Sequence, residues 1–378
     1  MKNCLGIINM SENDSTMGAL TQNRPTAMLP IAGRYRVIDF VLSNMVNSGI
    51  TGIGVFTGNK VRSVMDHLGS GQPWDLDRKL NGLFVFTPTY DYHSIHRKIG
   101  DLELFFENNS FVKYAKQDYL LFSKSYMLAN IDYNEAFKAF LESGADISIV
   151  YKKVKDKSNA FLGCDKIHFD DDGVFESIGT NLGMDIEFNM SMEMYFIKKS
   201  VYFEILYDAV EKGNANYLKQ AIFNNLDKYK VHTHEFKGHV FPINTIKNYF
   251  NANMGILKSD IEKDLFFSNG HILTKVKDEP STYYKQNAKV KNSFVANGCI
   301  IDGYVENSII FRGVKIDKGC IIRNSIVMQK SDIQENVHLN YVILDKRAKV
   351  SKGVTLIGDP SSPYIASKKA TITREGEQ

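Results

Sequence analysis

A short apolar repeat in the last quarter of the chain constrains the fold more than any other feature. Its steps begin at Asn292, Asn307, Asn324 and Asn340, at spacings of 15, 17 and 16 residues. Two apolar residues close each step, and further apolar pairs preceded by glycines lie between the steps. Short apolar steps about every five or six residues, with glycines at the corners, are typical of a hexapeptide β-helix.

The repeat also predicts how much of the chain the β-helix occupies. Three steps form one triangular coil, and each coil buries its apolar residues only against neighbouring coils. The tract from about 288 to 358 therefore predicts roughly four coils of about 18 residues. A helical period does not accommodate so many valines and isoleucines at this spacing. The polar residues 359–378 are expected to form a capping strand and a frayed tail.

The preceding residues show a different texture, in which short apolar runs alternate with helical patterns. Strands are expected at residues 5–8, 52–56, 119–122 and 146–151, and helices at 37–46, 133–141 and 248–257. This alternation indicates βαβ units and a doubly wound, mostly parallel α/β sheet. Ligands of such folds bind beyond the carboxyl ends of the strands. We expect an α/β domain over residues 1–258, a linker over 259–286 and the β-helix over 287–378.

Composition excludes several classes of protein. The net charge of +3 favours neither nucleic acid nor an anionic membrane as a partner. No apolar run approaches the ~18 residues that would cross a membrane, and the N-terminus lacks the pattern of a signal peptide. The four cysteines are far apart and form no dense disulfide framework. We therefore expect a cytoplasmic protein in a reducing environment.

Several tracts in the same order connect this chain to a known family. The segment Pro-Ile-Ala-Gly-Arg-Tyr-Arg-Val-Ile-Asp-Phe at residues 30–40 resembles bacterial ADP-glucose pyrophosphorylases, the glucose-1-phosphate adenylyltransferases. Further similar tracts lie at residues 68–71, 73–76, 191–192, 236–238, 249–254 and 343–346. The resemblance covers nearly the whole chain. It implies a Rossmann-like nucleotidyltransferase domain followed by a left-handed β-helix.

The loop after the first strand departs from this family. Nucleotidyl transfer needs backbone amides around a triphosphate, which the family supplies with a Gly-Gly-x-Gly-x-Arg loop. Residues 9–16 contain no glycine here, so their side chains would block close approach of the backbone. Glu12 and Asp14 would also bring negative charge to the place of an anionic ligand.

Four further positions lose the family's reactive side chains. Thr26 stands where the family has a lysine, and Asn181 where the sugar-phosphate tract has another. Tyr126 and Pro242 stand where the family has the two carboxylates that bind the metal. Phenol and proline do not replace carboxylates as ligands of a hard cation. The resemblance therefore implies no catalytic residues, no metal site and no cofactor on this chain.

Within the family, this pattern resembles the GlgD-type subunits, which partner a catalytic subunit in glycogen synthesis in some bacteria. It implies a regulatory subunit in a hetero-oligomer, with a heterotetramer expected and Mg²⁺ held by the catalytic partner. Arg34 and Lys346 match cationic positions that contact phosphorylated effectors in relatives, and both suit a phosphorylated sugar. The alternative is that both side chains are solvated or paired with acidic residues.

Three other functions stay open from the sequence. The chain could be a weakly active adenylyltransferase with non-standard ligands, a stand-alone sensor of sugar phosphates or nucleotides, or a hexapeptide acyltransferase. The last leaves the N-terminal domain unexplained. Candidate cation sites are better explained as structure: residues 170–173 form a hairpin-turn motif, and His232, His234 and His239 have no acidic or thiol partners at ligand spacing.

Overall fold

The structure, a computed structural model, describes residues 1–12, 14–88 and 100–377. It divides into two compact units that each combine distant segments of the chain. The first comprises Met1–Glu12, Phe40–Pro242 and Asn269–Leu273, and the second Asn13–Asp39, Ile243–Ser268 and Thr274–Gln378. Among the described residues, none of the helices combines the length and the apolar character that crossing a bilayer requires.

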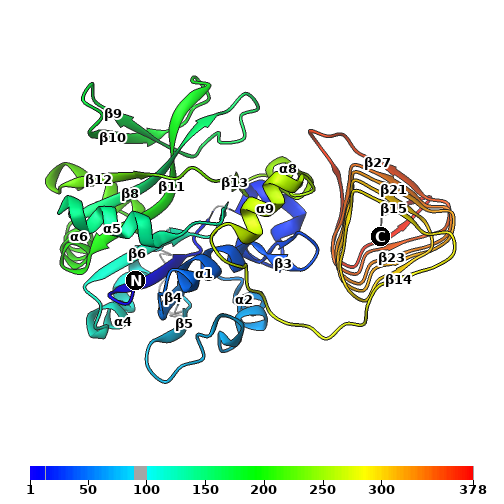
Figure 1. Cartoon of the computed structure of the whole chain (residues 1–378), viewed down its shortest axis with the longest axis horizontal. Helices are drawn as coiled ribbons and strands as arrows, with labels where there is room; N and C mark the ends of the chain where they lie inside the picture. The colour runs from blue at the N-terminus through cyan, green and yellow to red at the C-terminus, as the bar shows by residue number, and fades with distance from the viewer. Residues whose placement is uncertain (13, 89–99, 378) are drawn as a thin grey trace. The chain divides into compact units, whose positions relative to one another are not determined.

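A nine-stranded sheet forms the centre of the first unit (Figure 1). Its main path runs β10-β9-β11-β6-β1-β4-β5, while β8 pairs with both β11 and β12. The strands are β1 (Cys4–Asn9), β4 (Gly52–Phe56), β5 (Gly82–Phe86), β6 (Tyr119–Lys124), β8 (Ile147–Lys155), β9 (Asp165–Phe169), β10 (Phe175–Thr180), β11 (Glu187–Lys198) and β12 (Val231–Glu235).

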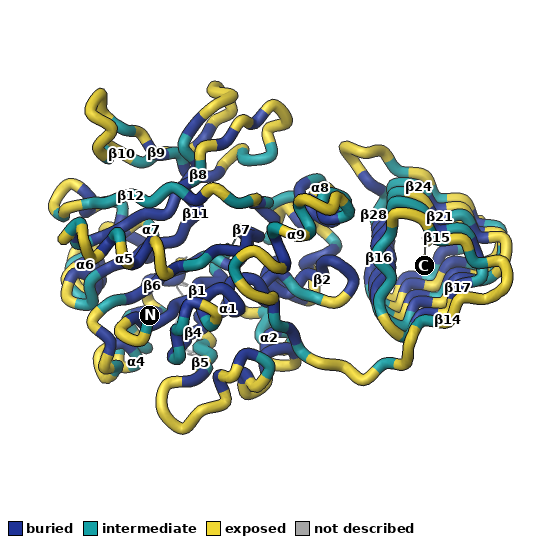
Figure 2. The backbone as a smooth tube through the Cα atoms, viewed as in Figure 1, coloured by how far each residue is buried: buried dark blue, intermediate teal, exposed yellow. Residues whose placement is uncertain are grey.

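The sheet is mixed, although its centre is parallel as expected. Strands β5, β4, β1 and β6 run parallel, whereas β11 runs antiparallel to β6, β8 and β9. All six residues of β1 are buried, as is usual for a central parallel strand that is covered on both faces (Figure 2). The carboxyl ends of β1 and β6 therefore meet at one edge of the sheet, next to residues 9–12 and 124–126.

Helix α5 (Tyr133–Ser143) of this unit begins and ends where the sequence provides caps. It begins after Asp132, whose carboxylate accepts a hydrogen bond from the backbone of Asn134, and ends at the left-handed Gly144. The other helices are α1 (Val37–Asn47), α2 (Val61–Leu68), α3 (Leu102–Glu107), α4 (Asn109–Tyr114), α6 (Lys199–Lys212) and α7 (Leu218–Phe223). A two-stranded ladder joins β7 (Met127–Leu128) to β13 (Phe241–Pro242).

The second unit contains the β-helix, whose stacked coils are coloured yellow to red in Figure 1. Its three sheets have the orders β14-β17-β20-β23-β26-β29-β30, β15-β18-β21-β24-β27 and β16-β19-β22-β25-β28. These strands are β14 (Tyr283–Tyr284), β15 (Lys289–Lys291), β16 (Phe294–Val295), β17 (Ile300–Ile301), β18 (Tyr304–Glu306), β19 (Ile309–Ile310), β20 (Lys315–Ile316), β21 (Ile321–Arg323), β22 (Ile326–Val327), β23 (Asp332–Ile333), β24 (His338–Asn340), β25 (Val342–Leu344), β26 (Lys349–Val350), β27 (Thr355–Ile357), β28 (Tyr364–Ala366), β29 (Thr371–Thr373) and β30 (Gly376–Glu377). Every pairing is parallel except the terminal one of β29 (Thr371–Thr373) with β30 (Gly376–Glu377). The predicted hexapeptide β-helix is therefore confirmed.

The β-helix is longer than the predicted tract. It begins with β14 (Tyr283–Tyr284) and continues through β28 (Tyr364–Ala366) and β29. The loop between β27 (Thr355–Ile357) and β28 interrupts the period, so the last coil does not continue the sequence repeat. The expected capping strand after residue 359 is confirmed, because β28 and β29 extend the stack and β30 closes it. Residues 364–366, 371–373 and 376–377 are therefore strands, so the expected frayed tail does not include them.

The first three Asn steps of the repeat mark one corner of the coils, whereas in the next coil Asn340 ends strand β24 and Tyr341 takes the left-handed corner conformation with a φ of 55°. Asn292, Asn307 and Asn324 have φ values of 39°, 46° and 45°, in the left-handed region that Asn tolerates better than most residues. The amide of Asn292 donates to that of Asn307 at 2.7 Å, so successive corners are also linked to one another. The repeat therefore follows from the backbone conformation that each corner requires.

Shorter elements complete the second unit. They are the 3-10 segments η1 (Asp14–Thr21, kinked at Gly18) and η2 (Thr26–Met28), strands β2 (Pro30–Ile31) and β3 (Tyr35–Arg36), and helices α8 (Ile246–Gly255) and α9 (Ser259–Phe267). Thr245 caps α8 by accepting a hydrogen bond from the backbone of Asn248. Helix α9 occupies residues that we expected in a linker, so the irregular connection to the β-helix is shorter than expected.

Candidate functional site

The glycine-free loop at the end of β1 is held by internal hydrogen bonds. The Glu12 carboxylate accepts hydrogen bonds from the backbone N–H of Ser125 at 2.9 Å and from its hydroxyl at 2.6 Å. The ammonium of Lys124 donates to the hydroxyl of Ser11 at 2.6 Å. Burial raises the pKa of Glu12, an effect that the nearby Lys124 opposes. The residues after β1 thus bind the residues at the end of β6 and just after it. Asn13, the next residue of this loop, lies outside the described residues.

A second carboxylate, that of Asp101, joins three segments at the same edge. It accepts hydrogen bonds from the Asn9 amide at 2.7 Å, from the Ser11 hydroxyl, and from the backbone N–H of Leu218 at 2.7 Å. Asp101 is only 4% exposed. We call the region beyond the carboxyl ends of β1 and β6 the strand-end site. This part of it is organised around a buried acidic group rather than around free backbone amides.

Tyr126 and Pro242, the two positions where we expect the family's metal carboxylates to be replaced, lie close together. Pro242 of β13 pairs with Met127 of β7, directly after Tyr126. The Tyr126 side chain is buried, and its hydroxyl donates a hydrogen bond to the Glu193 carboxylate. Burial and the charge of Glu193 raise the pKa of Tyr126 well above its ordinary value, so this phenol stays protonated and is a poor cation ligand.

The partner of Tyr126 belongs to an acidic cluster that the sequence did not indicate. The Lys219 ammonium lies 3.3 Å from one Glu193 oxygen and 2.9 Å from the nearer Asp165 oxygen. Burial and the neighbouring Glu193 raise the pKa of Asp165 to about 6. These residues come from α7, β11 and β9, far apart in the sequence, and no local motif marks them.

Asn181 serves the backbone of its own loop. Its amide donates to the carbonyl of Phe161 at 3.0 Å, and its side-chain oxygen accepts from the backbone N–H of Gly183 at 2.9 Å. The side chain is therefore engaged in shaping the loop, and it carries no charge with which to bind a phosphate.

Thr26 has an equally local role in the second unit. Its backbone N–H and its hydroxyl both donate to one carboxylate oxygen of Asp14, at 3.0 and 2.8 Å. This arrangement ties η1 to η2. It also means that Asp14, like Glu12 in the first unit, uses its carboxylate for hydrogen bonds within the chain.

The other candidate cation sites show structural roles. The side-chain oxygen of Asp170 accepts hydrogen bonds from the backbone of Asp172 and Val174, which closes the β9–β10 hairpin. His232 is 2.9 Å from the hydroxyl of Ser148 on the adjacent strand. Within the described part of the chain, no group of three or more His, Cys, Asp or Glu side chains could hold a metal ion.

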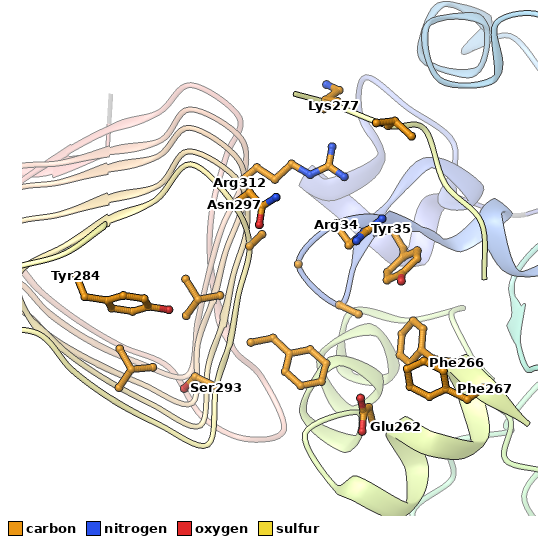
Figure 3. Close-up of a pocket in the computed structure, with 17 residues that line it drawn as sticks. Arg34, Tyr35, Glu262, Phe266, Phe267, Lys277, Tyr284, Ser293, Asn297 and Arg312 are labelled. Carbon is orange, nitrogen blue, oxygen red and sulfur yellow. The ribbon is translucent and has the colours of Figure 1, made fainter. Parts of the chain in front are cut away.

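Arg34, the first effector candidate, lines a cavity of about 610 Å³ in the second unit (Figure 3). One side of this cavity is aromatic, and the ring centroids of Tyr35 and Phe266 are 5.0 Å apart. Lys277 and Arg312 contribute two further cationic groups to its lining. An aromatic wall with several cations suits an anionic ligand that also has an apolar part.

Lys346, the second effector candidate, follows β25 (Val342–Leu344) and is flanked by other cations. Burial, together with the charges of Arg36 and Arg24, lowers its pKa to about 6, while Asp345 opposes the shift. Arg24 forms a buried ion pair with Asp345, with 2.7 Å between the charged atoms and 5% and 3% of the two side chains exposed. Lys346 therefore sits in a positive field that an additional anion would neutralise.

Further cations recur at the corner that Lys346 occupies, and the sequence reasoning missed them. Arg312, Lys346 and Lys368 occupy equivalent positions there, with Gln329 in the coil between the first two. The next position adds further basic residues, at Lys330, Arg347 and Lys369. Burial and the charge of Arg34 lower the pKa of Arg312, and burial with the charges of Arg36 and Arg312 lowers that of Lys277. The coil period was the available signal, because equal corner positions stack on one another.

Comparisons with known proteins agree with this architecture. Residues 16–178 match the family described as nucleotidyl transferase, and residues 279–376 match the family described as GlmU-like, C-terminal hexapeptide. The chain is 32% identical over 364 residues to the glycogen biosynthesis protein GlgD of Bacillus subtilis, covering 96% of this chain and 95% of that protein. It is 35% identical over 318 residues to GlgD of Geobacillus stearothermophilus, covering 84% and 82%.

Similarity extends at lower identity to glucose-1-phosphate adenylyltransferases. The glucose-1-phosphate adenylyltransferase of Bacillus cereus strain ATCC 10987 is 27% identical over 367 residues, covering 93% of this chain and 94% of that enzyme. This chain thus shares its framework with an enzyme over almost its whole length. At the strand-end site, however, this chain carries Tyr126 and Pro242.

Proposed function

Because this chain belongs to the family of GlgD-type glycogen biosynthesis proteins and glucose-1-phosphate adenylyltransferases, we propose that it is a regulatory, non-catalytic subunit. It modulates a catalytic paralogue that forms ADP-glucose and diphosphate from ATP and glucose 1-phosphate. The observation that carries this proposal is the buried hydrogen bond of Tyr126 with Glu193, at a position where the family's chemistry needs a metal carboxylate.

The chemistry of the strand-end site supports this proposal. Nucleotidyl transfer requires a cation such as Mg²⁺ and donors aimed at the transferred phosphoryl group. Tyr126 is protonated, Pro242 has no ligand atom, and Asn181 and Thr26 carry no positive charge. We therefore expect the catalytic partner to hold the Mg²⁺ and this chain to need no cofactor.

Regulation requires a site that an effector fills differently in two states of the assembly. Two places supply such chemistry: the cavity that Arg34 lines with Lys277 and Arg312, and the cationic surroundings of Lys346, which does not line that cavity. A phosphorylated sugar carries the opposite charge to both. The assembly would be a hetero-oligomer with the catalytic paralogue, with a heterotetramer as the expected form.

One observation favours a second function, a weak adenylyltransferase activity of this chain alone. Asp165 and Glu193 bring two carboxylates next to Tyr126, although neither lies at the family's metal positions. These acids could hold a cation if Lys219 moved away. In the structure the Lys219 ammonium occupies the space between them and pairs with both, which argues for the regulatory function instead.

An assay of ADP-glucose synthesis separates the two functions. This chain, its catalytic paralogue and their mixture are each supplied with Mg²⁺, ATP and glucose 1-phosphate. We expect no turnover by this chain alone, and a changed rate or activator response in the mixture together with co-elution of the two proteins. Substantial EDTA-sensitive activity of this chain alone would establish the second function. The regulatory proposal would be contradicted if the mixture formed ADP-glucose at the sum of the two separate rates and the two proteins did not co-elute.

Paired variants test the effector site in the same mixture. Lys346→Ala should weaken the response to a phosphorylated sugar without lowering the basal rate of the mixture. Lys349→Ala is the matched control, because Lys349 is an exposed lysine on the neighbouring strand β26 (Lys349–Val350). Equal responses from both variants would argue against Lys346 as an effector residue.

A further inference from the structure

Glu193 has an unusual backbone conformation within strand β11. The pairing of β11 with β8 shifts register between Ser191 and Met194, and Glu193 lies in this bulge with a φ of 51°. A left-handed conformation is costly for residues with a Cβ and persists only where surrounding contacts impose it. Glu193 is only 5% exposed, so the contacts of its buried side chain must maintain this backbone conformation.

The carboxylate of Glu193 takes part in a network with Tyr126, Asp165 and Lys219, in which both acids are buried and the lysine side chain is 33% exposed. One of its oxygens accepts the hydrogen bond of Tyr126, and the other lies 3.3 Å from the ammonium of Lys219. The same ammonium donates to both oxygens of Asp165, at 2.9 and 3.1 Å. Lys219 is thus paired with two acidic groups of its own chain.

This network lies at the edge of the sheet where α/β folds bind ligands. Lys124, the last residue of β6, lines a cavity with Glu193 and Lys219, and the cavity has a volume of about 20 Å³. That volume holds about one water molecule, whereas pockets for small organic ligands measure several hundred Å³. Lys124 and Lys219, whose ammonium groups could bind a phosphate, therefore line a cavity that is too small to hold one.

We propose that Glu193 and Asp165 act as a built-in substitute for an anionic ligand, which keeps the strand-end lysines Lys219 and Lys124 from binding phosphate or diphosphate groups. The site is an autoinhibited anion site. Removal of the two acids frees Lys219 and opens space beside it. The inference deepens the proposed function, because it names the contact that excludes phosphorylated substrates from this chain.

Calorimetric titration of the purified full-length chain with inorganic diphosphate tests this inference. The decisive variant combines Glu193→Gly with Asp165→Asn. Glycine suits the left-handed φ of residue 193, and asparagine keeps the shape of aspartate. At pH 8, where the wild-type Asp165 with its pKa of about 6 is ionised, this variant should bind diphosphate roughly tenfold or more tightly than the wild type, since like charges next to an anion oppose its binding.

Two further variants keep the result interpretable. Adding Lys219→Ala to the double variant must abolish the gain, which separates this site from the cations around Lys346. Glu193→Gln retains the size of the side chain but loses its charge, and should give a smaller gain even if the glycine variant folds poorly. Wild-type binding that already depends on Lys219 would overturn the proposal, as would folded variants that gain no affinity. Neither outcome depends on the regulation of a catalytic partner.

Discussion

Single charged residues in this protein are shaped by the segments that pack around them. Lys346 has a pKa of about 6 because it is buried beside Arg36 and Arg24, and the Arg24–Asp345 ion pair spans more than three hundred residues of sequence. A lysine in such surroundings is largely neutral at physiological pH until an anion joins it. Its protonation is therefore coupled both to folding and to ligand binding.

Replacement of Lys346 by Met tests this coupling through the pH dependence of stability. The folded-state pKa is depressed below the ordinary 10.5, so between about pH 6 and 10.5 the unfolded state binds more protons. Wild-type stability should thus gain a contribution as pH rises through this window. Lys346→Met should be more stable than the wild type near pH 6, by a margin that shrinks toward pH 10.

Urea unfolding at several pH values measures this margin. Lys349→Met serves as the control, because the side chain of Lys349 is exposed and its replacement should leave the pH dependence unchanged. A Lys346→Met margin that stays constant from pH 6 to 10 would show that the amine titrates normally in the folded protein.

At the scale of elements, the β-helix shows why its repeat contains paired apolar residues. Ile310 and Val327 point into the interior core of the coils. The preceding residues, Ile309 and Ile326, belong to the opposite face of the same sheet and are nevertheless completely buried. This sheet is therefore covered on both faces, whereas the sheet that contains β21 (Ile321–Arg323) exposes its outer face.

Two adjacent isoleucines of β21 provide a matched test of this packing. Ile322 lies in the interior core and is completely buried, while Ile321 is on the outer face and is partly exposed. Ile322→Ala should lower the free energy of unfolding by about 2–5 kcal/mol, since it leaves a cavity between coils. Ile321→Ala should cost clearly less. Urea unfolding of both variants measures the difference, and equal losses would contradict the assignment of the interior face.

The whole molecule is built from two units that interleave along the sequence. The segments Asn13–Asp39 and Ile243–Ser268 belong to the same compact unit as the β-helix, although the α/β sheet of the other unit lies between them in the chain. Hydrogen bonds within this unit reflect the grouping, such as that of the Tyr249 hydroxyl with the carbonyl of Pro30 at 2.5 Å. Compact units of this kind commonly open as cooperative blocks.

Hydrogen exchange can test this division with the Ile322→Ala variant. Destabilised coils should speed exchange in helix α8, which belongs to the same unit as the β-helix. Helix α5 of the other unit is the internal control and should change less. Mass spectrometry of exchanged peptides resolves the two helices, and equal acceleration in both would mean that the units unfold together.

The sequence predicted those features that depend on local pattern. The Asn steps and glycines indicated the β-helix, because each corner requires a particular backbone conformation, and buried apolar runs located β1, β4 and β6. The loss of cation ligands at Tyr126 and Pro242 is what the family resemblance implies, and it stays a prediction. The last coil was missed because an inserted loop breaks the period, and helix α9 because its segment carried no clear helical signal.

Only the tertiary structure decided how the charged groups are paired. Asp165, Glu193 and Lys219 lie on three elements that have no shared motif, and the strand register and the β11 bulge bring them together. Arg24 reaches Asp345 in the same way, through packing within the second unit. Hydrophobic and turn patterns act over a few residues and can be read along the chain. The interaction of buried charges depends on distance and solvent exposure, which exist only once distant segments have packed against one another.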